Sequence, residues 1–203
     1  MRKLLHIIVT VFFSCSVMAS DNDLYLAIEN NPIFIGVEES CPAQYLGEES
    51  TRAVFNNHYD VCSKRKLYCL SKCEKGSANH CAGLAFAMQS ENAPKIYFER
   101  LYALGCKLGS ISSCTNRAAG IMRYEKSRLS CSVETFRLTC SDRDAWGCTM
   151  YGLLLSRGIG VEKDVELALK VLKTGCINGP EDEACKYAKS LMGEILNSSN
   201  VSE

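Results

Sequence analysis

The sequence predicts an all-α fold, a solenoid of antiparallel helix pairs that disulfide bonds link into repeats. Cysteines recur as pairs that enclose seven residues, or eight in the last pair. The pairs are Cys73/Cys81, Cys106/Cys114, Cys140/Cys148 and Cys176/Cys185, and the second cysteines of successive pairs lie 33, 34 and 37 residues apart. A fixed spacing inside a repeat of this length is typical of solenoids built from paired helices.

Residues 1–19 have the pattern of a signal peptide. Arg2 and Lys3 give a positive start, an apolar run extends from Leu4 to Phe13, and Ala19 ends a small-residue stretch that a signal peptidase accepts. The apolar run is short for a membrane span, so a retained anchor is the less favoured alternative. We expect cleavage after Ala19, export to the periplasm or out of the cell, and no membrane insertion afterwards.

Twelve of the thirteen cysteines lie after this signal peptide. An even number of cysteines in an exported chain indicates a disulfide framework. Metal binding is the alternative, but the chain has no Cys-x-x-Cys and only His58 and His80 follow the signal peptide. The formal net charge is zero, and neither a basic stripe nor a basic amphipathic helix stands out. We therefore expect no metal, no cofactor, no nucleic acid and no membrane surface as partners.

The rest of the chain divides into a leader, a solenoid and a tail. Residues 20–40 are polar and then mildly apolar, with Pro32 and Gly36 as breakers, and we expect an irregular leader there. Residues 41–196 are expected to form about four helical pairs plus a capping helix. The polar residues 197–203 are expected to be disordered.

The clearest unit starts at Cys148, where apolar residues recur at helical spacing. Gly158 and Gly160 are expected to form the turn between its two helices, because glycine adopts positive φ without strain. Asp164 can cap the second helix, which Gly175 ends.

The other units are less regular copies of this one. We expect helix pairs over 81–106 and 114–140 and a final single helix over 185–196, whereas 41–73 is the least regular unit. In the clearest unit, the small residues Gly152 and Ala168 suit a close crossing of the two helices.

Within each cysteine pair, the first cysteine should end one helix and the second should begin the next. A bridge there closes a short turn and should stabilise the fold by about 2–3 kcal/mol. Of the four other cysteines, we favour a Cys41–Cys69 bridge, because antiparallel helices would bring these residues together. Cys62 lies about 10 Å from Cys69 if one helix holds both, which is too far unless that helix breaks. Cys62 and Cys131 are left open as free, bridged after distortion, or bonded to another molecule.

The clearest unit resembles the Sel-one-like repeat, a relative of the tetratricopeptide repeat. The matching residues are Cys148, Tyr151, Gly152, Gly158 to Val161, Asp164, Ala168, Gly175, Cys176 and Cys185. The cysteine spacing resembles that of the Helicobacter-type cysteine-rich proteins, and residues 104–114 are a second close match. The resemblance implies a right-handed superhelix in the bacterial periplasm or outside the cell that binds proteins or peptides. Some such proteins bind penicillins and hydrolyse β-lactams slowly, and others resemble immunity proteins against injected toxins.

Two short motifs match those of serine β-lactamases. They are Ser63-x-x-Lys66 and Lys173-Thr174-Gly175, but the Ser-Asp-Asn motif of these enzymes is absent. The repeat already explains the glycine of the second motif. We therefore expect no catalytic residue, and we keep penicillin binding with weak β-lactamase activity as the alternative function.

The expected function is non-catalytic protein binding through a curved groove, for example as an immunity protein that neutralises a toxic effector. A secreted factor acting on host cells is a third possibility. First helices usually line the concave face of such solenoids, so the candidate contacts are Arg117, Arg123, Tyr151 and Arg157. Trp146, the only tryptophan, either anchors a partner or packs over the Cys140–Cys148 bridge.

Overall fold

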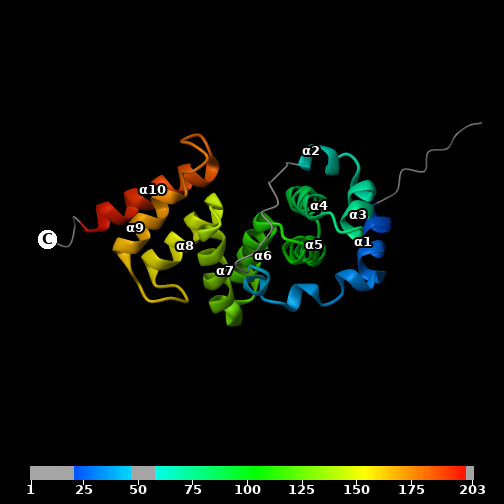
Figure 1. Ribbon diagram of the computed structural model, residues 1–203, viewed down its shortest axis with the longest axis horizontal. Coiled ribbons are helices and arrows are strands. Elements are labelled where there is room, and N and C mark those ends of the chain that lie inside the picture. The colour runs from blue at the N-terminus through cyan, green and yellow to red at the C-terminus, as the bar shows by residue number, and fades with distance from the viewer. Residues whose placement is uncertain (1–20, 47–57, 200–203) are drawn as a thin grey trace, which may run out of the picture.

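The computed structural model describes residues 21–46 and 58–199, and these residues form helices and turns without a strand. The helices are stacked along one long axis, with α1 and α10 at opposite ends (Figure 1). From α3 to α9, each helix packs against the next one in the chain. The all-α class and the stacking of adjacent helix pairs are therefore confirmed. The α-helices are α1 Asp21–Asn30, α2 Tyr59–Cys62, α3 Lys66–Glu74, α4 Ala78–Ser90, α5 Lys95–Lys107, α6 Ile111–Tyr124, α7 Leu129–Ser141, α8 Ala145–Arg157, α9 Val165–Thr174 and α10 Glu183–Ser199.

Three helix pairs repeat along the chain, namely α4 with α5, α6 with α7, and α8 with α9, and α10 follows as a single helix. These elements match the pairs expected over 81–106, 114–140 and 148–176. The last helix continues to Ser199, so residues 197–199, expected in a disordered tail, are helical. Residues 200–203 lie outside the described part of the chain.

In the clearest unit, the residue types explain both the turn between α8 and α9 and the close crossing of these two helices. Gly158 and Gly160 have φ of +67° and +69°, and the Asp164 carboxylate caps α9 by accepting from the Leu167 amide at 2.8 Å. Gly152 lets α8 and α9 approach closely, because a Cβ there would lie 2.6 Å from Leu172 Cγ. The local sequence thus determines the geometry of this pair.

The N-terminal segment differs from the expected irregular leader. Residues 21–30 form α1, which buries Leu24 and Ile28 and packs against α3 and α5. The spacing of four residues between these side chains places them on one helix face. The signal peptide expected over residues 1–19 lies outside the described residues.

Residues 31–46, which we call the strap, form three short 3-10 turns, η1 Pro32–Phe34, η2 Val37–Glu39 and η3 Pro42–Tyr45. The strap runs from the end of α1 along α5 to α6 and α7 (Figure 1). Cys41 is the N-cap of the 3-10 turn η3 and starts no α-helix. Within the region 41–73, the described residues 41–46 belong to the strap, and α2 and α3 follow from Tyr59, so no long first helix of the repeat type is found in its described part.

Four disulfides close the turns between units. They join Cys73 to Cys81, Cys106 to Cys114, Cys140 to Cys148 and Cys176 to Cys185, with Cα–Cα distances of 4.7, 4.6, 4.4 and 4.2 Å. Each bridge ties the second helix of one unit to the start of the next unit.

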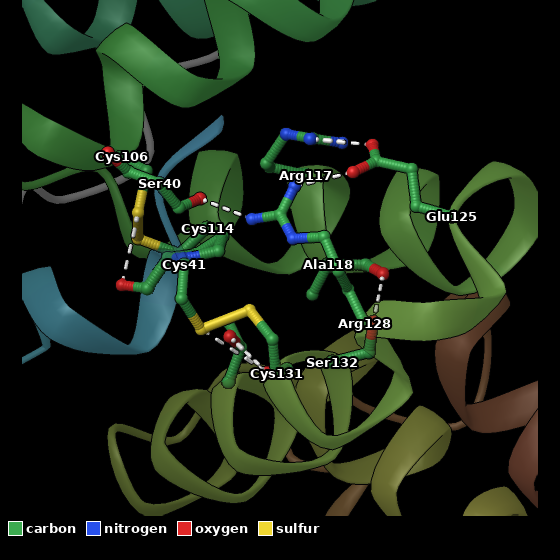
Figure 2. The surroundings of a disulfide bond; sticks show 12 residues. Ser40, Cys41, Cys106, Cys114, Arg117, Ala118, Glu125, Arg128, Cys131 and Ser132 are labelled. Carbon is green, nitrogen blue, oxygen red and sulfur yellow. Dashed lines mark hydrogen bonds and ion pairs between the residues drawn. A yellow bond between two sulfur atoms is a disulfide. The ribbon is translucent and has the colours of Figure 1, made fainter. Parts of the chain in front are cut away.

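The favoured Cys41–Cys69 bridge was wrong, and the pairing of Cys62 and Cys131 had been left open. Cys41 is bonded to Cys131 rather than to Cys69, and Cys62 is bonded to Cys69. The Cys62–Cys69 bridge forms because the helix breaks between α2 and α3, which brings the two Cα atoms to 5.5 Å. Cys131 lies in the first turn of α7, and the strap carries Cys41 to it (Figure 2).

The six disulfides are typical of a protein from an oxidising compartment. In residues 21–46 and 58–199, no helix has both the length and the apolar character that a membrane crossing requires.

Candidate protein-binding groove

A groove of about 590 Å³ crosses the first helices of successive units. Its lining comes from α4, α6 and α8, from the turn between α9 and α10, and from the start of α10, with one side chain from α5. The lining residues are Ala82, Phe86, Tyr102, Ser112, Asn116, Asp144, Ala145, Trp146, Asn178, Asp182 and Glu183. The groove therefore lies on the side of the solenoid where first helices were expected to meet a partner.

The repeat register places side chains at this groove. Three of them lie two residues before the second cysteine of a pair, at the N-terminal end of a first helix. They are Ser112, Trp146 and Glu183. The disulfides join each of these helix starts to the end of the preceding helix or to the turn that follows it.

Aromatic rings form the apolar part of the groove. Phe86 and Trp146 are 47% and 43% exposed, although both are large apolar side chains. Tyr187 on α10 lies beside the groove, with its ring centroid 6.2 Å from that of Trp146. Tyr102 is buried, and its hydroxyl donates to Gln89 Oε1 at 2.7 Å. Exposed aromatic side chains gathered in one hollow are typical of a protein-binding surface.

Carboxylates form the polar part of the groove. Asp144 caps α8, and its Oδ1 accepts hydrogen bonds from the Gly147 amide at 2.6 Å and the Thr115 hydroxyl at 3.0 Å. Burial raises the pKa of Asp144, the negative charge of Asp182 acts in the same direction, and the two hydrogen bonds oppose them. Both carboxylates line the same groove.

Trp146 is the one predicted contact residue that lines the groove. Arg117 is buried instead, with 2% of its surface exposed, and is unavailable to a partner. Its guanidinium pairs with Glu125 at 2.7 Å (Figure 2). It also pairs with Glu99 at 2.9 Å and donates to the Glu38 carbonyl of the strap at 2.6 Å. The strap and α5 cover this face of α6. The prediction that Arg117 contacts a partner was therefore wrong.

The other three predicted contacts are outside the groove lining: Arg123 and Arg157 lie at the C-terminal ends of α6 and α8, and Tyr151 lies in the middle of α8. Arg123 is exposed beside the Tyr124 ring, and Arg157 pairs with Glu194 at 3.3 Å. Tyr151 is half-buried and packs against the apolar cluster that contains Phe136.

Sequence reasoning missed Phe86, Asn116 and Asp144. Aligning the units on the second cysteine would have placed Asn116 two residues after Cys114 on the same face as Ser112. Asp144 directly precedes an Ala-Trp helix start, which is a recognisable capping position. Phe86 is distinguished only by its exposure, which the sequence does not contain.

The two β-lactamase-like motifs do not come together. Lys66 begins α3 and pairs with Asp21 and Glu91, whereas Lys173, Thr174 and Gly175 end α9. Figure 1 places α3 and α9 toward opposite ends of the molecule. Within the two described ranges, no three histidine, cysteine or acidic residues are grouped so as to hold a metal ion.

The comparisons with known proteins give no match: no family model, no curated protein and no solved structure is significantly similar to this chain. The Sel-one-like resemblance therefore stays a prediction that depends on the residues of the repeat.

Proposed function

We propose that this chain is an exported, non-catalytic repeat protein that binds a segment of a partner protein in the groove across α4, α6 and α8. The observation that carries the proposal is the exposure of Phe86 and Trp146 on the walls of one hollow. Large aromatic side chains of this kind supply most of the binding energy in protein interfaces. The disulfides are compatible with a periplasmic or secreted location.

A toxic effector is the partner class that the repeat resemblance favours, and an immunity protein is the narrower form of the proposal. The disulfides suit this role, because they fix the start of each first helix to the preceding turn or helix and so restrict its motion in the unbound protein. A preformed groove loses less conformational entropy on binding.

The alternative, penicillin binding with weak β-lactamase activity, finds less support in the groove. Asp144, Asp182 and Glu183 are the ionisable groups of its lining other than Tyr102. A β-lactam carries a carboxylate, which these groups would repel. A Ser/Lys nucleophile is also absent from the lining.

The test is capture of a partner from a periplasmic extract with the wild-type protein and with Trp146→Ala and Phe86→Ala. Tyr124→Ala is the matched control, because Tyr124 is 42% exposed and lies outside the groove lining. We expect the same partner with wild type and Tyr124→Ala, and a loss of at least about tenfold in affinity with each groove variant. A partner that all four proteins bind equally would contradict the proposal. So would β-lactam turnover by the folded protein with no partner.

A further inference from the structure

The charge of the groove differs from that of the whole chain. The chain has a formal net charge of zero, with 23 basic and 23 acidic residues. The described residues that line the groove include Asp144, Asp182 and Glu183, but no lysine, arginine or histidine. Glu183 is paired with Lys186 at 2.9 Å, so the two aspartates are the carboxylates without a basic partner among the described residues. A site that carries only acidic charges on a neutral chain is electrostatically complementary to a cation.

Asp144 and Asp182 each keep acceptor capacity for a ligand. Both hydrogen bonds to Asp144 fall on Oδ1, and no described residue donates to its Oδ2. Asp182 Oδ1 accepts from the Ala184 amide at 3.0 Å. Both aspartates line one groove, and the negative charge of Asp182 contributes to the raised pKa of Asp144, so a cation placed against both would be attracted by both charges as well as donate hydrogen bonds.

The aromatic part of the groove narrows the choice of cation. Trp146 and Phe86 present exposed rings beside these carboxylates. A guanidinium group is planar, stacks on aromatic faces and donates to carboxylates in pairs, whereas an ammonium group is a compact and strongly hydrated charge. The combination of rings and acceptors is better suited to arginine than to lysine. The groove volume of about 590 Å³ is within the range of sites that enclose a ligand of this size.

We propose that the groove binds an arginine side chain on the partner segment, with its guanidinium at Asp144 and Asp182 and its stem and plane on the aromatic wall. The inference rests on the proposed function and names the residue type that the groove selects.

Trp146 makes the proposal measurable, because it is the only tryptophan and lies in the groove. Its intrinsic fluorescence can follow titration with two capped pentapeptides, Ala-Leu-Arg-Leu-Ala and the same peptide with citrulline in place of arginine. Citrulline keeps the shape of the side chain and removes its charge. We expect a saturable change with the arginine peptide, and weaker binding of the citrulline peptide by about tenfold or more.

The variants that test the carboxylates are Asp144→Asn, Asp182→Asn and the double variant, with Glu166→Gln as an exposed control outside the groove. Asparagine is also a good helix cap, so Asp144→Asn should keep the start of α8 intact, and circular dichroism can check this. We expect the double variant to bind both peptides alike, and Glu166→Gln to retain the preference for arginine. Added salt should weaken binding of the arginine peptide more than that of the citrulline peptide.

Equal binding of the two peptides by the wild type, or no saturable change up to about 10 mM, would overturn the arginine proposal. The same holds if the double variant keeps the wild-type preference. The proposed function is tested separately by the captured partner. If that partner is lost with Trp146→Ala but retained by the double aspartate variant, the groove binds a protein without selecting arginine. If neither Trp146→Ala nor Phe86→Ala weakens capture of the partner, the proposed function is contradicted together with the arginine proposal.

Discussion

Cys41 is bonded to Cys131, 90 residues further along the chain, and this bridge fastens the strap across α5, α6 and α7. Polar contacts from two arginines support it, and Figure 2 shows the one from Arg128 to Ser40. Arg128 donates to the carbonyls of Glu39 and Ser40 at 2.8 and 3.0 Å, and Arg117 donates to that of Glu38. The strap therefore acts as a clamp that holds the α4–α5 pair against the α6–α7 pair. It adds to the turn disulfides, which join neighbouring units.

Removing this clamp should destabilise the protein more than removing a turn disulfide. The bridge closes a loop of 90 residues, and the chain-entropy argument gives about 4–5 kcal/mol for such a loop, against about 2–3 kcal/mol for the nine-residue separation of Cys176 and Cys185. Chemical denaturation of Cys41→Ser/Cys131→Ser and Cys176→Ser/Cys185→Ser measures the two losses. An equal or smaller loss for the long-range pair would contradict a clamping role.

Arg117→Met should lower the free energy of unfolding by about 3–5 kcal/mol, because it removes the buried ion pairs with Glu99 and Glu125 and the hydrogen bond to the Glu38 carbonyl. Arg123→Met is the control on the same helix, and its exposed side chain predicts a change within about 0.5 kcal/mol. Thermal or urea unfolding checks both. Similar effects for the two variants would show that Arg117 is not part of the interior as described.

Stability should fall as the pH rises from about 4.5 to about 7 because of Glu99. Burial raises the pKa of Glu99 from 4.5 to about 7, against the opposing attraction of Arg117. The folded protein therefore keeps a proton in this range that the unfolded chain has released, so folding is favoured below the window and less favoured above it. The loss is at most about 3 kcal/mol. Urea midpoints of wild type and Glu99→Gln across this range test the sign, and the variant should depend less on pH. A wild type that gains stability relative to Glu99→Gln over the same window would contradict it.

Gly152→Ala should destabilise the protein by about 1–3 kcal/mol, because the new methyl group would lie 2.6 Å from Leu172 Cγ. Gly193→Ala is the matched control in α10. No atom lies within 4 Å of the Cβ it adds, so helix propensity alone should stabilise it by about 0.5–1 kcal/mol. Thermal unfolding compares the two. The same direction of change at both positions would be inconsistent with the close crossing of α8 and α9.

Features that depend on residues close together in the chain could be predicted from the sequence. The helix pairs follow from the repeat of apolar residues, and the turn disulfides follow from the short cysteine spacing, as for Cys140 and Cys148, which meet across a single turn. The Cys41–Cys131 bridge depends on a contact between residues distant in the chain, and no spacing indicates it. The burial of Arg117 depends on the strap, which lies outside the repeat pattern.

The candidate groove was predictable only in part. Trp146 stands out as the single tryptophan, and first helices were expected to face a partner. The exposure of Phe86 and the presence of Asp144 and Asp182 in one groove lining arise from the stacking of different units, which the sequence of one unit does not reveal.

Photo-crosslinking in the native compartment tests the central claim most directly. p-Benzoylphenylalanine replaces Phe86 in the groove in one protein and Tyr124 outside the groove in another, and irradiation is followed by mass spectrometry. We predict a crosslink from position 86 to one partner protein, on a segment that contains arginine, and none from position 124. Crosslinks to that partner from position 124 alone, or from neither position while the partner is bound, would contradict the account.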